Sequence, residues 1–222
     1  MYQGLYDEIV RFASTGDLAP ELTRAREEYV QRTGQLLETD TDFERRIAAF
    51  LEWYVLDRLL APSGLTPAQL YLDAGGADAD DVTRQQLAQL GHTTLSLFEF
   101  RRVRGDHLAV DDLLTGERHQ VFERRRLAGL ESGDILEARL VASDGQLALT
   151  ETWAVHPRRA RDSILKAAKR WRKDHKGSVG DDGQGRIEFV HRVAYLANRS
   201  QRYRHVDPVQ IFADLRSEPS AA

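Results

Sequence analysis

The spacing of hydrophobic residues changes twice along this chain, and each change marks a change of secondary structure. In residues 1–92, apolar side chains recur every three or four positions, which is the period of an amphipathic helix. From Thr93 to Pro157 they alternate with polar residues, which is typical of half-buried strands. The sequence therefore predicts an α+β protein with a helical N-terminal region at 1–92, strands at 93–157 and helices at 158–222.

The N-terminal region is predicted to hold five helices. Gly34 ends the second, because glycine readily adopts the left-handed conformation that closes a helix. The third begins at a capping box, in which the side chains of Thr41 and Glu44 accept hydrogen bonds from backbone N–H groups. Pro67 follows Thr66 in the first turn of the fourth. The five predicted helices cover residues 5–13, 18–33, 41–60, 66–75 and 80–90.

The middle region is predicted to hold five short strands. The turns between them carry glycine where a positive φ is needed, at Gly105, Gly116 and Gly145. Short strands without intervening helices predict a small five-stranded β-barrel of SH3-like or OB-like type, and a flat sheet packed on helices is the alternative. The predicted strands cover residues 95–103, 108–113, 119–124, 135–141 and 147–155.

Residues 96–140 resemble a β module found in several uncharacterised bacterial proteins. The resemblance rests on Arg104-Gly105-Asp106, on Asp112-Leu113-Leu114-Thr115-Gly116-Glu117 and on Gly133-Asp134. These are mostly turn residues, so the resemblance implies a bacterial source and a local fold but no activity.

The C-terminal region is predicted to hold three helices and a disordered tail. A helix over 158–176 precedes a glycine-rich loop at 177–185, and a second helix covers 186–198. Asp207 and Pro208 begin a last short helix. The tail from Ser217 is predicted to be disordered.

All four lysines of the chain lie within eleven residues, and every other basic residue is arginine. Offsets of three, four and three residues place the lysines along one side of the 158–176 helix. An apolar seam of Ile164, Ala168, Trp171 and His175 occupies the opposite side, so the lysine side is expected to be accessible to solvent. The lysines are Lys166, Lys169, Lys173 and Lys176.

Charge is distributed unevenly. Residues 1–92 carry 8 basic and 16 acidic side chains, a net charge of −8, whereas residues 158–222 carry 15 and 8, a net charge of +7. Two interpretations stay open. The basic C-terminal region seeks an anionic partner such as nucleic acid, or the acidic N-terminal region is its partner, within the chain or across a dimer.

Two arginine clusters flank the predicted strands, and they either converge into an anion-binding patch or pair with carboxylates such as Glu99, Asp111, Asp112 and Glu123. The candidate anion- or partner-binding residues on the strands are Arg101, Arg102, Arg104, Arg124, Arg125 and Arg126, and those on the helix are Lys166, Lys169, Arg170, Lys173 and Lys176.

Other chemistry is not indicated. The chain has no cysteine, none of its seven histidines has metal-ligand spacing, and it has no phosphate-binding loop, nucleophile elbow or dinucleotide motif. We therefore expect no catalytic residue, no metal and no cofactor. The absence of a long apolar run and of a signal peptide predicts a cytoplasmic protein without membrane spans.

These observations favour a non-enzymatic macromolecule-binding protein with a protein-protein interaction or regulatory role. The alternative is a nucleic-acid-associated protein that uses the lysine helix and the strand arginines. Contact with four to six phosphates would then give a slope of about −4 to −5 for log affinity against log salt. An enzyme with an unrecognised site is the third hypothesis. The partner's identity and the oligomeric state stay open.

Overall fold

A computed structural model describes residues 3–75, 89–90, 93–125, 127, 129–143, 145–175 and 183–216. The chain divides into two compact units. Unit 1 comprises Met1–Gln31, Gln35–Thr94 and Leu140–Thr152, and unit 2 comprises Arg32–Gly34, Leu95–Arg139 and Trp153–Ala222. Most of the predicted helix at 80–90, most of the loop at 177–185 and the whole tail from Ser217 lie outside the described residues.

Unit 1 is built around the aromatic residues of α3. The ring of Tyr29 lies 5.5 Å from the ring of Phe50 and 5.5 Å from that of Trp53. The hydroxyl of Tyr54 donates to the carbonyl oxygen of Ala13 at 2.9 Å, and burial raises the pKa of Tyr54 to about 12. The helices are α1 (Gln3–Ala13), α2 (Ala19–Thr33), α3 (Phe43–Leu56) and α4 (Pro67–Gly75).

Of the helix ends predicted at Gly34, Thr66 and Thr41, the first two follow the sequence. Gly34, with φ of 91°, follows the last residue of α2 as predicted. A reciprocal cap begins α4, because the N–H of Thr66 donates to the side chain of Gln69 at 2.8 Å and the N–H of Gln69 donates to the Thr66 hydroxyl at 3.2 Å. The predicted capping box at Thr41 and Glu44 is wrong: α3 begins at Phe43, and its N-cap residue makes no side-chain cap.

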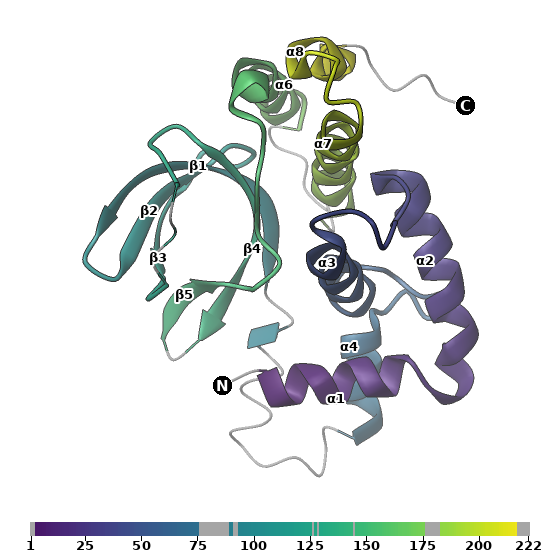
Figure 1. Ribbon diagram of the computed structural model, residues 1–222. Coiled ribbons are helices and arrows are strands. Elements are labelled where there is room, and N and C mark those ends of the chain that lie inside the picture. The colour runs from purple at the N-terminus through teal and green to yellow at the C-terminus, as the bar shows by residue number, and fades with distance from the viewer. Residues whose placement is uncertain are drawn as a thin grey trace. The chain divides into compact units, whose positions relative to one another are not determined.

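One sheet contains all the described strands. They are β1 (Thr94–Arg104), β2 (His107–Asp112), β3 (Arg118–Phe122), β4 (Ile135–Ser143), β5 (Gln146–Leu149) and β6 (Ala154–Val155). Their order is β1-β2-β3-β5-β4-β6, and β1 also pairs with β4, so five strands form the ring seen end-on in Figure 1. A β-bulge interrupts the antiparallel β1–β2 register between Phe100 and Arg102.

The α+β class, with helices towards both ends of the chain, is confirmed. Glycines at the predicted turns have positive φ, with values of 61° at Gly105, 83° at Gly116 and 75° at Gly145. The single strand predicted at 147–155 is wrong, because β5 and β6 are separate. Between them, the hydroxyls of Thr150 and Thr152 donate to the buried carboxylate of Glu52 at 3.1 and 2.8 Å. Those side-chain bonds accompany the break in the strand.

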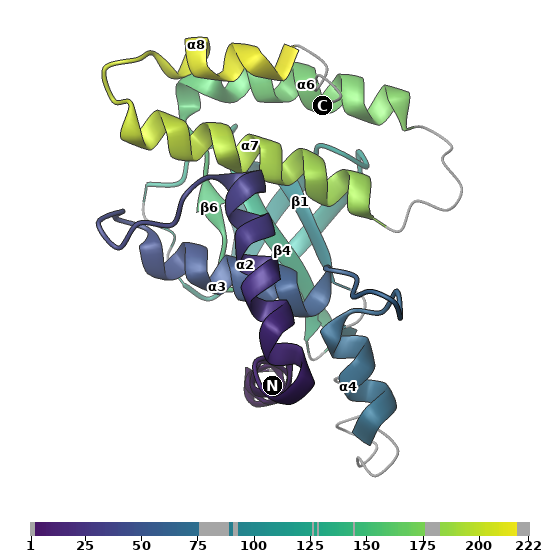
Figure 2. The same ribbon diagram turned by 90° about the vertical axis from the view of Figure 1, so that its right-hand side faces the viewer.

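Unit 2 packs helices on the outer face of β1 and β4. Leu97 of β1 and Ile135 of β4 share one buried cluster with residues of the C-terminal helices, while Phe98 and Phe100 point to the opposite face. Figure 2 shows the helices α6 (Arg161–Asp174), α7 (Gln184–Arg202) and α8 (Pro208–Ile211) layered together. As predicted, Asp207 caps α8 by accepting the N–H of Val209 at 2.9 Å.

Candidate anion-binding surface

Helix α6 has one buried side and one exposed side. Ile164, Ala167 and Ala168 are buried in the core cluster of unit 2, and Trp171 packs against it with its ring 6.0 Å from that of Phe189. The seam ends there. His175 was predicted to belong to it, but this residue is exposed beyond the last turn and stacks on Trp171 at 4.2 Å.

The exposed side of α6 carries the lysines. Lys166, Lys169 and Lys173 are all exposed, and none forms an ion pair or hydrogen bond with a described residue. The expectation of solvent access is therefore confirmed for these three, while Lys176 lies outside the described residues. We call Lys166, Lys169 and Lys173 the lysine face.

The arginines next to the lysine face are engaged in structural contacts. Arg170 donates to the carbonyl oxygen of Leu215 at 2.6 Å. A Cβ added at Gly116 would lie 2.6 Å from Nη1 of Arg172, so the guanidinium of Arg172 lies over that turn. Of the candidate cations on α6, the three lysines therefore have no partner among the described residues, whereas Arg170 is bonded to the backbone.

The 3-10 helix η2 (Arg158–Ala160), directly before α6, is tied to the turn before β4. Arg158 donates to Asp134 at 2.7 Å and to the carbonyl oxygen of Gly129 at 2.8 Å. Its hydrogen bonds lower the pKa of the Asp134 carboxyl against the opposing effect of burial. The same interaction raises the pKa of Arg158. The buried carboxylate of Asp134 is thus kept charged.

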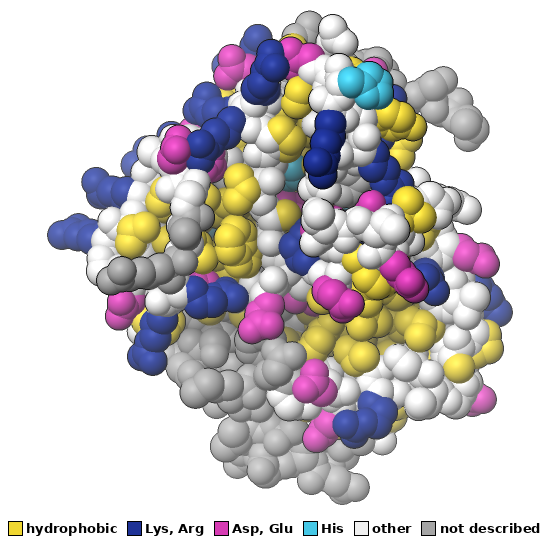
Figure 3. Space-filling model, viewed as in Figure 1, with side chains coloured by type: hydrophobic (Ala, Val, Ile, Leu, Met, Phe, Trp, Pro, Cys, Tyr) yellow, Lys and Arg dark blue, Asp and Glu magenta, His cyan; other side chains and the backbone are white. Residues whose placement is uncertain are grey.

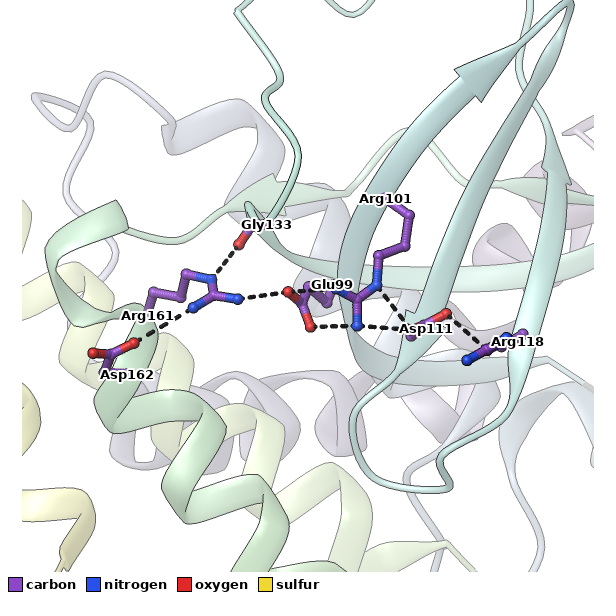
Figure 4. A network of polar contacts seen from close by, with 7 residues as sticks. All are labelled: Glu99, Arg101, Asp111, Arg118, Gly133, Arg161 and Asp162. Atoms are coloured by element: carbon purple, nitrogen blue, oxygen red, sulfur yellow. Dashed lines mark hydrogen bonds and ion pairs between the residues drawn. The ribbon is translucent and has the colours of Figure 1, made fainter.

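Figure 4 shows a chain of alternating charges that links α6 to β1 and β2. Arg161 donates to the buried carboxylate of Glu99 at 2.7 Å and to the carbonyl oxygen of Gly133 at 2.9 Å. Arg101 bridges Glu99 and Asp111 at 2.9 and 2.8 Å, and Arg118 reaches Asp111 at 3.8 Å. Arg101, a predicted anion-binding residue, is therefore paired with two carboxylates of its own sheet.

The other predicted strand arginines have different surroundings. Arg102 and Arg104 are exposed at the end of β1 and form no ion pair with a described residue. Arg124 lies 5.0 Å from the centre of the Phe122 ring. Arg125 pairs with Glu123 at 2.6 Å, and its hydrogen bonds outweigh the effect of burial and lower the Glu123 pKa. Arg126 lies outside the described residues.

Positive side chains thus gather in two places within unit 2. Figure 3 shows Lys and Arg side chains over the outer side of the strands and over the C-terminal helices. On the strands, carboxylates neutralise much of this charge. On α6 the lysine face has no such partners among the described residues. The lysine face is therefore the best candidate for binding an external anion.

Sequence reasoning missed a buried cluster of ionisable residues. His191 of α7 is 3% exposed and has its pKa lowered to about 3, chiefly by burial. Glu137 and Arg139 of β4 act on it electrostatically, as does Arg32. Nε2 of the buried His156 lies 3.4 Å from Glu137. Among the described residues, no group of three or more histidine, aspartate or glutamate side chains is arranged to hold a metal ion.

Sequence reasoning also missed an exposed basic and aromatic turn between α7 and α8. Arg202, Tyr203, Arg204 and His205 are all exposed. The rings of Tyr203 and His205 meet edge to face, with centres 6.2 Å apart. The signal available in the sequence was the direct alternation of basic and aromatic residues. We call these four residues the 202–205 turn.

No helix in the described part of the chain is both long and apolar enough to cross a membrane. Neither a curated protein nor a solved structure matches the chain. A protein-family model described as a family of unknown function, DUF7986, matches residues 20–194, which run from α2 into α7 and include the lysine face. Because the match covers most of the sequence, the chain belongs to the DUF7986 family.

Proposed function

We propose that this protein is a non-enzymatic nucleic-acid-binding protein and that the lysine face of α6 holds the phosphates. The observation that carries the proposal is the contrast between the lysine face and the paired arginines of unit 2. Arginines such as Arg101 and Arg161 bind carboxylates of unit 2. The lysines of α6 bind no described carboxylate of unit 2.

The geometry of α6 suits a phosphate backbone. Lys166 and Lys173 are seven residues apart, which is about 10 Å along a helix axis. Lysine binds phosphate as a point charge and does not read sequence, so we expect binding with little base preference. The buried seam and the Arg161–Glu99 ion pair hold α6 on the sheet, so binding need not order the helix.

The test is the salt dependence of binding. We would measure fluorescence anisotropy with labelled 20-base-pair DNA of random sequence at about 50 and 200 mM salt, where phosphate contacts dominate affinity. The variant K166Q/K169Q/K173Q should lose most of the binding. If each lysine meets one phosphate, the slope of log affinity against log salt should become shallower by about 3.

The matched control removes three exposed arginines from α1 and α2. The variant R11Q/R24Q/R26Q changes the net charge equally but leaves the lysine face intact. It should retain the slope of the wild-type protein. Failure of the wild-type protein to bind either this duplex or a single strand of the same length at about 50 mM salt would refute the proposal, as would an equal loss of slope in both variants.

A protein partner is the second candidate, and the uneven charge of the chain favours it. The first 92 residues of another copy, with net charge −8, complement the +7 of residues 158–222. Sedimentation at about 50 and 500 mM salt would test this. A dimer at low salt that dissociates at high salt, together with no DNA binding, would support the second candidate.

A cytoplasmic location and closure of the ring as an SH3-like or OB-like barrel stay predictions.

A further inference from the structure

The 202–205 turn combines exposed aromatic rings with exposed cations. The side chain of Tyr203 is 49% exposed, the second-highest exposure among the large hydrophobic residues of the described chain. Arg202 and Arg204 are its neighbours in the sequence, and His205 packs edge to face with its ring. Proteins that bind single-stranded nucleic acids combine aromatic rings, on which the bases stack, with nearby cations that contact the phosphates.

Backbone hydrogen bonds fix the shape of this turn. The N–H of Tyr203 donates to the carbonyl oxygen of Arg199 at 2.8 Å, and the carbonyl oxygen of Tyr203 accepts the N–H of Val206 at 2.8 Å. Nε of Arg204 donates to the carbonyl oxygen of Gln201 at 3.2 Å. The rings are therefore presented from a defined backbone, which lowers the entropy lost when a base stacks on them.

The segment after this turn is joined to the 3-10 helix η2 (Arg158–Ala160), which directly precedes the lysine helix. Asp207, two residues after the turn, forms an ion pair with Arg159. Lys166 follows Arg159 by seven residues, about 10 Å along a helix axis. Twelve nucleotides span about 40 Å even at the phosphate spacing of a duplex strand. One short oligonucleotide is therefore long enough to meet both the turn and the lysine face.

We propose that the 202–205 turn is a base-stacking site, with Tyr203 as its platform, and that the preferred ligand of this protein is single-stranded rather than duplex nucleic acid. This inference rests on the proposed function, because the lysine face supplies the phosphate contacts. A duplex keeps its bases stacked on one another and leaves Tyr203 unused, whereas a single strand offers free bases.

The experiment compares three labelled ligands: a 12-nucleotide oligothymidine, an abasic 12-mer with the same phosphates, and a 12-base-pair duplex. Removing the ring in Y203A should weaken oligothymidine binding about tenfold and leave abasic binding unchanged. Y203F keeps the ring and should bind like the wild-type protein. Y195A is the matched control, because Tyr195 is an exposed tyrosine of α7, the helix that precedes the turn, at 38% exposure.

The outcomes separate the two proposals. If the wild-type protein binds none of the three ligands, both proposals fail. If it binds oligothymidine and the abasic strand equally, and Y203A changes neither, the lysine face stands and the stacking site is refuted. Tighter binding of the duplex than of oligothymidine refutes the stacking site as well. Circular dichroism melts of Y203A and Y195A should match the wild-type melt, since both side chains are exposed.

Discussion

The stability of this protein should fall with acidity because of one buried histidine. His191 lies in unit 2 with its pKa lowered to about 3, against 6.5 for a free histidine. Burial is the main cause, the positive charges of Arg32 and Arg139 act in the same direction, and Glu137 opposes them. His191 is therefore neutral in the folded protein throughout the range in which a free histidine becomes charged.

The sign and size of the effect follow from linkage. Below pH 6.5 the unfolded chain binds a proton at His191 and the folded chain does not, so acid favours unfolding. The loss begins near pH 6.5 and continues until the pH falls to the folded pKa of about 3. Each pH unit costs about 1.4 kcal/mol, so about 2 kcal/mol should be lost at pH 5 through this residue alone.

Urea unfolding at pH 7.5, 6.5, 5.75 and 5 would measure this loss. H191L removes the titrating group, so its free energy of unfolding should depend on pH less steeply by about 1.4 kcal/mol per pH unit. The control V193A removes a buried side chain that does not titrate from the same helix and should keep the wild-type dependence on pH. An unchanged dependence in H191L would refute the reasoning, whatever the absolute stability of that variant. A His191 resonance that titrates near pH 6.5 would refute it too.

Two further predictions concern α6 and its surroundings. I164A removes a fully buried side chain and should cost about 2 to 5 kcal/mol of unfolding free energy, whereas K166A, on the exposed side of the same helix, should change it by less than about 0.5. G116A should lower the free energy of unfolding by about 1 to 2 kcal/mol, because Gly116 has φ of 83° and Arg172 lies over it. G4A in α1 meets open space and should stabilise the protein slightly. Thermal melts would measure both changes.

Local features were predictable from the sequence. The end of α2 at Gly34, the turn at Gly116 and the cap of α8 at Asp207 depend only on nearby residues, and all three are confirmed. The capping box at Thr41 failed although its pattern was correct. The carboxylate of Asp42 binds Arg45 at 2.6 Å, and the helix begins one residue later than that box requires. The spacing of Thr41 and Glu44 alone therefore did not fix where the helix begins.

The candidate site shows the same division. Exposure of Lys166, Lys169 and Lys173 follows from helical period alone, because an apolar seam fixes which side of a helix is buried. Pairing of Arg101 with Glu99 and Asp111 required the strand register to be known. The sequence left both pairing and anion binding open for that arginine, and geometry decided for pairing.

By itself, the sequence determined the α+β class, the positions of most turns and the exposed lysine side of α6, because each depends on residues within a few positions of one another. Tertiary structure alone decided which charged side chains find partners within the protein. Arg161 meets Glu99 across 62 positions of the chain, and Thr152 meets Glu52 across 100. Such pairs form only when the fold brings distant segments together and removes them from water, which no local pattern encodes.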